Sequence, residues 1–289
     1  AMVCDIVRCR KYKPSEQLRE LKQPLSLEYA TRDNTVDTYT NIDKLIPQLL
    51  RDIYHAKEYV QFQFFKFEND SLGLVVREEL INKAQEGVPV YVIYDAFPGA
   101  IVDHSFFHEM QLYGVKVHRY NPIFPIPSAY SNNRNHRKIV VIDGKVAVTG
   151  GLNLADEYIN ELERFGYWMD CAVMIKGEAV QSFLAMFCSM WEFTTGEGID
   201  MIAHTSQERT LERGFLLPYA DGPLDNKNPA EGIYMQILNS AQRYVYIATP
   251  YLIIDNTMKS LLIMAAKSGI DVRIITPHVP DKWYVHPVT

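Results

Sequence analysis

Two polar side chains that can act on a phosphate stand two residues apart, just before an apolar run. The stretch NHRKIVVIDGKVAV covers residues 135–148. Because side chains alternate along a strand, His136 and Lys138 are expected on one face, and Arg137 and Asp143 on the other. An imidazole can attack phosphorus, while an ammonium neutralises oxygens of the same group. The pair therefore predicts a site for one small anionic group.

Simpler interpretations fit the same residues. A histidine at a strand end is often structural, and Lys138 could extend its ammonium to the surface. Asp143-Gly144 between two β-rich arms is typical of a tight hairpin turn. Asn153, beyond the compact corner Gly150–Gly151, could donate a further hydrogen bond. The spacing alone leaves both interpretations open.

An internal repeat indicates which elements position these residues. Residues 46–65 read as a helix and an alternating strand, and residues 231–250 repeat them, with Tyr59-Val60 recurring 185 residues later as Tyr244-Val245. Residues 80–95 resemble residues 262–277 in the same way. Each of these later segments predicts an amphipathic helix that ends at a glycine, followed by a strand; the glycines are Gly87 and Gly269. Helix–strand–helix–strand units predict an α/β protein with a largely parallel sheet.

The bulk properties exclude several classes. A net charge of −6 argues against a general nucleic-acid binder. The four cysteines have no C-x-x-C spacing, which excludes a usual zinc site and favours reduced, buried thiols. No run of eighteen apolar residues is present to span a bilayer. The basic opening fits a solvated arm or a contact with an anionic membrane; it contains Arg8, Arg10, Lys11 and Lys13.

The extended pattern resembles a known family. The motif H-x-K-x4-D-x6-G-G-x-N, which resembles that of the phospholipase D superfamily, is formed by His136, Lys138, Asp143, Gly150, Gly151 and Asn153. Most of the chain is similar to bacterial cardiolipin synthases, from YTNIDKLIPQLL through RFGYWMDCAVMI to IATPYLIIDNTM. The resemblance implies a phospholipase D-like α/β/α layered sheet with a pseudo-twofold repeat. We expect a basic arm over 1–34, a first domain over 35–215 and an incomplete second domain over 216–289.

The resemblance also implies a two-step reaction without metal or cofactor. One histidine attacks the phosphodiester to form a phosphohistidine, and the opposing histidine protonates the leaving alkoxide. In a cardiolipin synthase, the phosphatidyl group of one phosphatidylglycerol then passes to a hydroxyl of another, and glycerol leaves. By this analogy His136 is the nucleophile or the general acid/base, Lys138 and Asn153 hold phosphate oxygens, and Gly150 and Gly151 lie against the substrate.

Other positions take their expected roles from the same resemblance. Asp170, in GYWMDCAVMI, either occupies the place of an acidic partner for the histidine or is a structural aspartate that opens the next strand, and we favour the first. Asp143 is expected to position the hairpin, by an ion pair or by turn chemistry alone. Asp156 and Glu157 are expected in the exposed first turn of a helix. Tyr251 either touches the head group or simply ends a strand. The proline-rich loop 121–133 either meets acyl chains or packs as a lid.

The sequence departs from the family in two respects. No membrane-spanning helix precedes the motif, and the second H-x-K-x4-D is absent from the 289 residues, since the repeat would place its histidine near position 318. We therefore expect half an active site, with little turnover unless another molecule supplies the rest. The expected partners are phosphatidylglycerol and the surface of the bacterial cell membrane, with no nucleic acid and with a homodimer possible. A dimeric phosphodiesterase or nuclease and a non-catalytic lipid-binding module remain alternatives.

Overall fold

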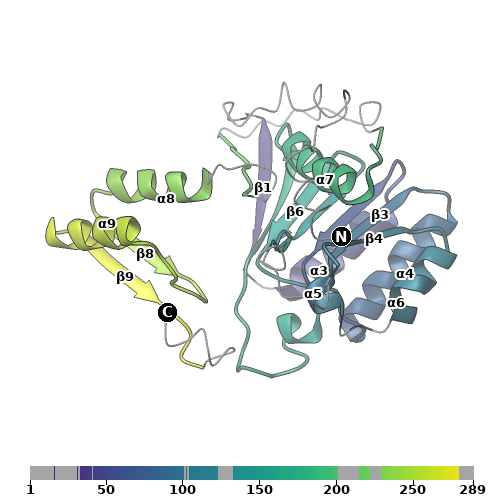
Figure 1. Cartoon of the computed structure of the whole chain (residues 1–289), viewed down its shortest axis with the longest axis horizontal. Coiled ribbons are helices and arrows are strands. Elements are labelled where there is room, and N and C mark those ends of the chain that lie inside the picture. The colour runs from purple at the N-terminus through teal and green to yellow at the C-terminus, as the bar shows by residue number, and fades with distance from the viewer. Residues whose placement is uncertain are drawn as a thin grey trace. The chain divides into compact units, whose positions relative to one another are not determined.

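The chain folds into two compact units (Figure 1). The computed structural model describes residues 16, 31, 33–40, 42–100, 102, 104–122, 133–200, 215–221 and 229–279. The first unit holds nearly all described residues up to Pro218. The second holds those from 229 onward, together with the short stretches Glu163–Tyr167 and Tyr219–Asp221. The domain bounds expected from the sequence stay a prediction.

The first unit is built on one seven-stranded sheet. Its strand order is β1-β7-β6-β5-β2-β3-β4. Strands β2, β3 and β4 are parallel, whereas β5, β6, β7 and β1 pair antiparallel with their neighbours. The strands are β1 (Asn34–Tyr39), β2 (Val60–Phe64), β3 (Val90–Asp95), β4 (Lys116–Tyr120), β5 (Ile139–Ile142), β6 (Val146–Gly150) and β7 (Ala172–Gly177). The expected largely parallel sheet is wrong for this unit, because four of its six strand pairings are antiparallel, including the β5–β6 hairpin.

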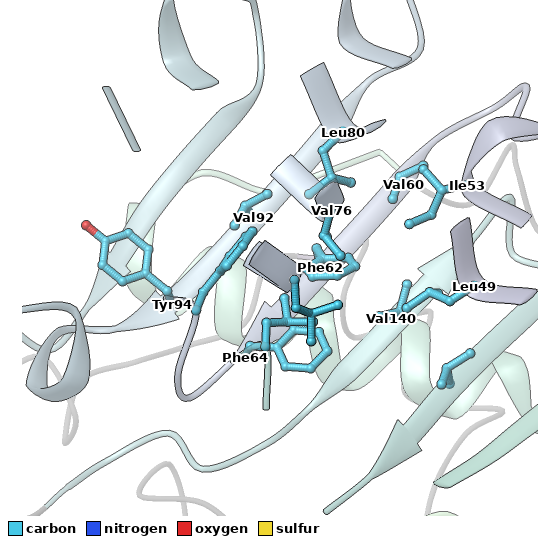
Figure 2. Packing of buried hydrophobic residues seen from close by; sticks show 14 of the residues in the cluster. Leu49, Ile53, Val60, Phe62, Phe64, Val76, Leu80, Val92, Tyr94 and Val140 are labelled. Atoms are coloured by element: carbon cyan, nitrogen blue, oxygen red, sulfur yellow. The ribbon is translucent and has the colours of Figure 1, made fainter. Parts of the chain in front are cut away.

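Helices cover both faces of this sheet. Even-numbered residues of β2 pack with apolar residues of α3 (Ile42–Tyr54), α4 (Ser71–Gln85) and α6 (His104–Leu112). Figure 2 shows part of this layer, including Phe62, Leu49 and Val76. The opposite face packs against α7 (Val180–Thr195), where Phe187 and Trp191 are buried. The predicted α/β/α layering is confirmed. Two short helices, α5 (Ala96–Gly99) and η2 (Asp156–Ile159), follow strand ends.

The hairpin predicted from Asp-Gly joins β5 to β6. Asp143 and Gly144 have φ angles of 52° and 62°. Positive φ at both central residues belongs to the turn whose twist matches antiparallel strands. The turn therefore fixes the register of β5 against β6, in which Ile139 lies opposite Thr149.

The second unit repeats the helix–strand–helix–strand order of the first, as predicted. Its two strands are parallel, like β2 and β3. The predicted glycine caps are confirmed, since Gly87 and Gly269 both have a φ of 89°. The elements of the second unit are α8 (Pro229–Ser240), β8 (Tyr244–Ala248), α9 (Asn256–Lys267) and β9 (Asp271–Ile275).

Within the described residues, none of the helices has the length and apolar character needed to cross a membrane.

Candidate active site

The side chains of His136 and Lys138 meet at the start of β5, as strand alternation predicted. Lys138 Nζ lies 3.0 Å from His136 Nδ1 and 3.2 Å from Nε2, and it donates to the His136 carbonyl oxygen at 2.8 Å. The strand itself begins one residue later, at Ile139. His136 is exposed, while Lys138 is only 6% exposed. The imidazole of His136 is thus accessible to a substrate, while the ammonium group of Lys138 that contacts it is buried.

The electrostatic state of Lys138 suits a site that binds an anion. Burial lowers the pKa of Lys138 to about 8, and the nearby charge of Asp170 partly offsets this by raising it. The centre of the Phe65 ring lies 4.8 Å from the centre of the His136 ring. It lies 5.8 Å from Lys138 Nζ. An aromatic ring beside the ammonium keeps water from one side of it. A bound phosphate would supply a negative charge that stabilises the buried ammonium group of Lys138.

Asp170 lies just before β7, the strand that pairs with β6. Its carboxylate accepts hydrogen bonds from Trp168 Nε1 at 3.1 Å and from the Cys171 backbone N–H at 2.8 Å. Its charge acts on Lys138, so the structure brings these two predicted residues into one electrostatic neighbourhood. The role of Asp170 as the partner of His136 stays a prediction.

The two glycines at the end of β6 have a packing reason for lacking a side chain. A Cβ on Gly151 would lie 2.9 Å from Asp170 Cγ, and one on Gly150 would lie 2.8 Å from Ala172 Cα. These approaches are too close for any larger residue. Gly151 therefore lets Asp170 approach the end of β6, and Gly150 lets the backbone of β7 approach. The predicted contact of both glycines with substrate stays a prediction.

Asn153 is buried, and both ends of its amide are engaged. Its Nδ2 donates to Tyr158 Oη at 2.7 Å, and its Oδ1 accepts from the Lys66 backbone N–H at 3.2 Å. Asn153 thereby ties η2 to the segment that follows β2. One amide hydrogen is already used within the protein, so the predicted phosphate contact would depend on the second.

Asp143 is not brought together with His136. Six residues of extended chain separate the two, which corresponds to roughly 20 Å. The Asp143 carboxylate accepts hydrogen bonds from three successive backbone N–H groups, those of Lys57 at 2.9 Å, Glu58 at 2.8 Å and Tyr59 at 3.0 Å. These contacts hold the loop between α3 and β2, so the Asp143 side chain does more than form the β5–β6 turn. We therefore assign Asp143 to positioning β2 beside β5.

Asp156 and Glu157 differ from the expected exposed helix turn. Glu157 is 9% exposed and forms an ion pair with Lys66 at 3.0 Å. The Asp156 carboxylate accepts from the backbone N–H groups of Ser71 and Leu72 at the start of α4. The prediction of exposure was wrong because these acids follow the strand end and face α4 and Lys66 across the fold.

The remaining predictions fall on other parts of the chain. Tyr251 is half-buried and belongs to the second unit, where its backbone N–H points to Thr249 Oγ1 at 3.4 Å. Most of the loop 121–133 and most of the arm 1–34 lie outside the described residues, as do Cys4 and Cys9. The buried-thiol prediction is confirmed for Cys188 and wrong for Cys171, which is exposed beside Asp170 because it precedes β7.

Sequence reasoning missed the residues that support the pair from neighbouring strands. Phe65 follows β2, and β2 pairs antiparallel with β5, so Phe65 arrives beside His136. Asp95, at the end of β3, is 1% exposed and bonds to the segment before His136. Both positions lie at the carboxyl ends of parallel strands, where α/β proteins commonly bind ligands. An acidic residue directly after a buried strand was the available signal for Asp95.

The fold matches that of a known lipid enzyme. The crystal structure of phosphatidylserine synthase from Haemophilus influenzae Rd KW20 superposes with a TM-score of 0.60 at 17% identity, covering 90% of this chain and 66% of that one. The likeness shows that the two chains share one α/β fold.

The family follows from the sequence comparison. The family model described as the phospholipase D-like domain of cardiolipin synthase matches residues 49–191 and 234–288, which is more than half of the chain. The chain belongs to this family, as the motif predicted.

Named relatives agree with this assignment. Cardiolipin synthase 2 of Bacillus cereus is 35% identical over 277 residues, which cover 94% of this chain and 54% of that protein. A protein of Streptococcus mutans described as uncharacterized is 41% identical over 253 residues, covering 86% of this chain and 55% of that protein. The chain thus spans about half the length of the curated relatives it matches.

Proposed function

We propose that this chain provides one half of the active site of a cardiolipin synthase-type phosphatidyltransferase. The contact between exposed His136 and sheltered Lys138 is the observation that carries the proposal. Family membership and the phospholipid enzymes among the relatives support the substrate class. The substrate would be phosphatidylglycerol, presented at the surface of the bacterial cell membrane.

In the first step, a ring nitrogen of His136 forms a bond to phosphorus while the bond from phosphorus to the oxygen of the head-group glycerol breaks. The opposing histidine, which the family resemblance assigns to the second repeat, gives its proton to the departing oxygen. Lys138 holds the equatorial oxygens, where negative charge develops, and Asp170 orients the imidazole. In the second step, a hydroxyl of another phosphatidylglycerol gives its proton to the opposing histidine and displaces His136 from phosphorus.

The test is a phosphatidyl-transfer assay on phosphatidylglycerol vesicles. The protein is a two-motif chain that carries this chain as its first half, and the products measured are cardiolipin and glycerol. Replacing His136 by Ala should abolish both products while the fold is kept. His108→Ala is the matched control, because His108 is an exposed histidine of α6.

Two further measurements separate the alternatives. After an alkaline quench, which preserves phosphohistidine, mass spectrometry should find the phosphatidyl group on the peptide that contains His136. Full transfer by His136→Ala would overturn the assignment. DNA cleavage without cardiolipin formation would favour the nuclease, and vesicle binding without turnover would favour the lipid-binding module.

A further inference from the structure

The segment just before His136 lacks regular secondary structure, yet it is held at several points. Residues 133–138 lie outside any strand. Side chains near the ends of three parallel strands, β2, β3 and β4, hold this segment: Gln63, Asp95 and Asn121. An irregular segment that carries a reactive group needs such anchors to keep a fixed geometry.

Asp95 is the central anchor. Its Oδ2 accepts from the Asn135 backbone N–H at 2.8 Å. Its Oδ1 accepts from the Phe97 backbone N–H at 2.8 Å and from Arg134 Nη1 at 3.1 Å. A carboxylate that is 1% exposed is tolerated only with such compensation. The buried charge of Asp95 therefore depends on the position of residues 134 and 135.

Asn135 extends this hold to the other side of His136. Its Oδ1 accepts from Gln63 Nε2 at 2.9 Å and from the Arg137 backbone N–H at 3.3 Å. The backbone N–H of residue 135 is thus fixed by Asp95, and that of residue 137 is fixed by Asn135. His136 lies between two tethered peptide groups, so its Cα position is set by the network.

We propose that Asp95, acting through Asn135, is a positioning residue that holds the His136 backbone in the geometry needed for attack on phosphorus. The role of His136 as nucleophile rests on the proposed function, but the placement of its side chain can be measured without turnover. Asp95 reaches the reaction only through the backbone, since its oxygens are used by residues 97, 134 and 135. Displacing a reacting group by about 1 Å can cost roughly a hundredfold in rate.

The decisive variant is Asp95→Asn, which keeps the shape but turns one acceptor oxygen into an NH2 group. That group must face a donor, either the Asn135 N–H or the Arg134 and Phe97 donors, so at least one anchor is lost. The first readout is the imidazole resonances of His136 in carbon–proton NMR spectra of the folded protein. We expect these resonances to shift. In the two-motif enzyme, kcat should fall roughly 10- to 100-fold with little change in KM.

Asp70→Asn is the matched control. Asp70 is the N-cap of α4 as Asp95 is of α5, and it accepts from the Gly73 N–H at 3.0 Å. It also holds a distant segment through the Asp156 N–H at 2.7 Å. This variant should lower stability without moving the His136 resonances. A second test variant, Asn135→Ala, leaves the Asp95–Arg134 ion pair in place and serves if Asp95→Asn fails to fold. It should shift the His136 resonances in the same way.

The outcomes separate this inference from the proposed function. If Asp95→Asn and Asn135→Ala lose stability but leave the His136 resonances and kcat as in the unaltered protein, Asp95 is merely structural and the inference is wrong. If the enzyme shows no phosphatidyl transfer at all, the NMR comparison still decides whether Asp95 positions His136. Shifted resonances combined with transfer by His136→Ala would overturn only the proposed function.

Discussion

The two units share a local plan but bury the two faces of their strands differently. In the first unit, Tyr59 and Gln61 are 1% and 0% exposed, because α7 covers that face of β2. Their equivalents 185 residues later, Tyr244 and Tyr246, are 57% and 55% exposed. The opposite face is covered in both units, as Val60 and Val245 are buried. The burial of a strand residue thus depends on which element packs on that face, and the sequence of the strand alone does not determine it.

The ends of the elements, in contrast, are nearly identical in the two units. Asp70 caps α4 by accepting from the Gly73 N–H at 3.0 Å, and Asp255 caps α9 by accepting from the Met258 N–H at 2.8 Å. Both helices are followed by a glycine with a φ of 89°. Local hydrogen bonding and backbone sterics therefore work the same way in a well-packed unit and in an exposed one.

The largest expected difference between the units lies in their cores. Phe62 is 0% exposed and contacts Phe64, with ring centres 4.8 Å apart, so Phe62→Ala should cost about 3–5 kcal/mol. Ile247, its equivalent in β8, is half-buried, and Ile247→Ala should cost about 1–2 kcal/mol. Hydrogen exchange followed separately in each unit measures both losses. Equal losses would show that the second unit is packed as tightly as the first.

The second expected difference concerns buried and exposed cations. The pKa of Lys138 is lowered by burial to about 8 from 10.5. Between these two pH values the unfolded chain binds more protons than the folded one, so the first unit should gain up to about 3 kcal/mol as pH rises. Over the same range Lys138 loses its charge, and binding of the diester glycerophosphoglycerol should weaken roughly tenfold per pH unit. Stability and anion binding therefore change in opposite directions.

Calorimetric titration at several pH values measures this binding, and thermal unfolding measures stability. In the second unit Arg273 is exposed and its pKa is raised by Asp271, so it stays charged throughout. Lys138→Arg is the matched variant, because a guanidinium keeps its charge above pH 8. The same loss of binding in Lys138→Arg would show that another group titrates.

The helix caps should differ by a smaller amount. Asp70 also accepts the Asp156 N–H at 2.7 Å, so Asp70→Ala should cost about 1–2 kcal/mol. Asp255 is fully exposed, and Asp255→Ala should destabilise less. The Met258 hydrogen bond lowers the pKa of Asp255, so its contribution is present at neutral pH and is lost as pH falls through that lowered pKa. Hydrogen exchange in α4 and α9 at neutral and acidic pH tests both statements. A larger loss in α9 would contradict them.

Much of the fold was predictable because it follows local rules. The repeat, the Asp143-Gly144 hairpin and the caps at Gly87 and Gly269 each depend on a few adjacent residues. The convergence of His136 and Lys138 could be predicted from their spacing of two residues, although both lie just before β5 begins. The mixed sheet was not predictable in the same way, since strand direction is set by pairing between distant segments.

The supporting residues of the site illustrate the same limit. Phe65 and Asp95 reach His136 and its neighbours only because β2 lies between β5 and β3, which is a property of strand order. Asp143 belongs to the same short motif, yet it lies at the other end of β5, where its carboxylate holds the loop before β2. Spacing along the chain identified the reacting pair, whereas the residues that hold it in place came from the pairing of the sheet.

The smallest expected difference is between the two capping glycines. A Cβ on Gly87 or Gly269 would meet no atom within 4 Å, so only the positive φ opposes a side chain. Gly87→Ala and Gly269→Ala should each cost about 1–2 kcal/mol, and by the same amount despite the unequal packing of the two units. Gly232→Ala is the control, since Gly232 lies inside α8 with equally open space and should instead gain about 0.5–1 kcal/mol. Unequal losses at Gly87 and Gly269 would mean that packing reaches the helix ends, and the separation of local from tertiary effects in this protein would fail.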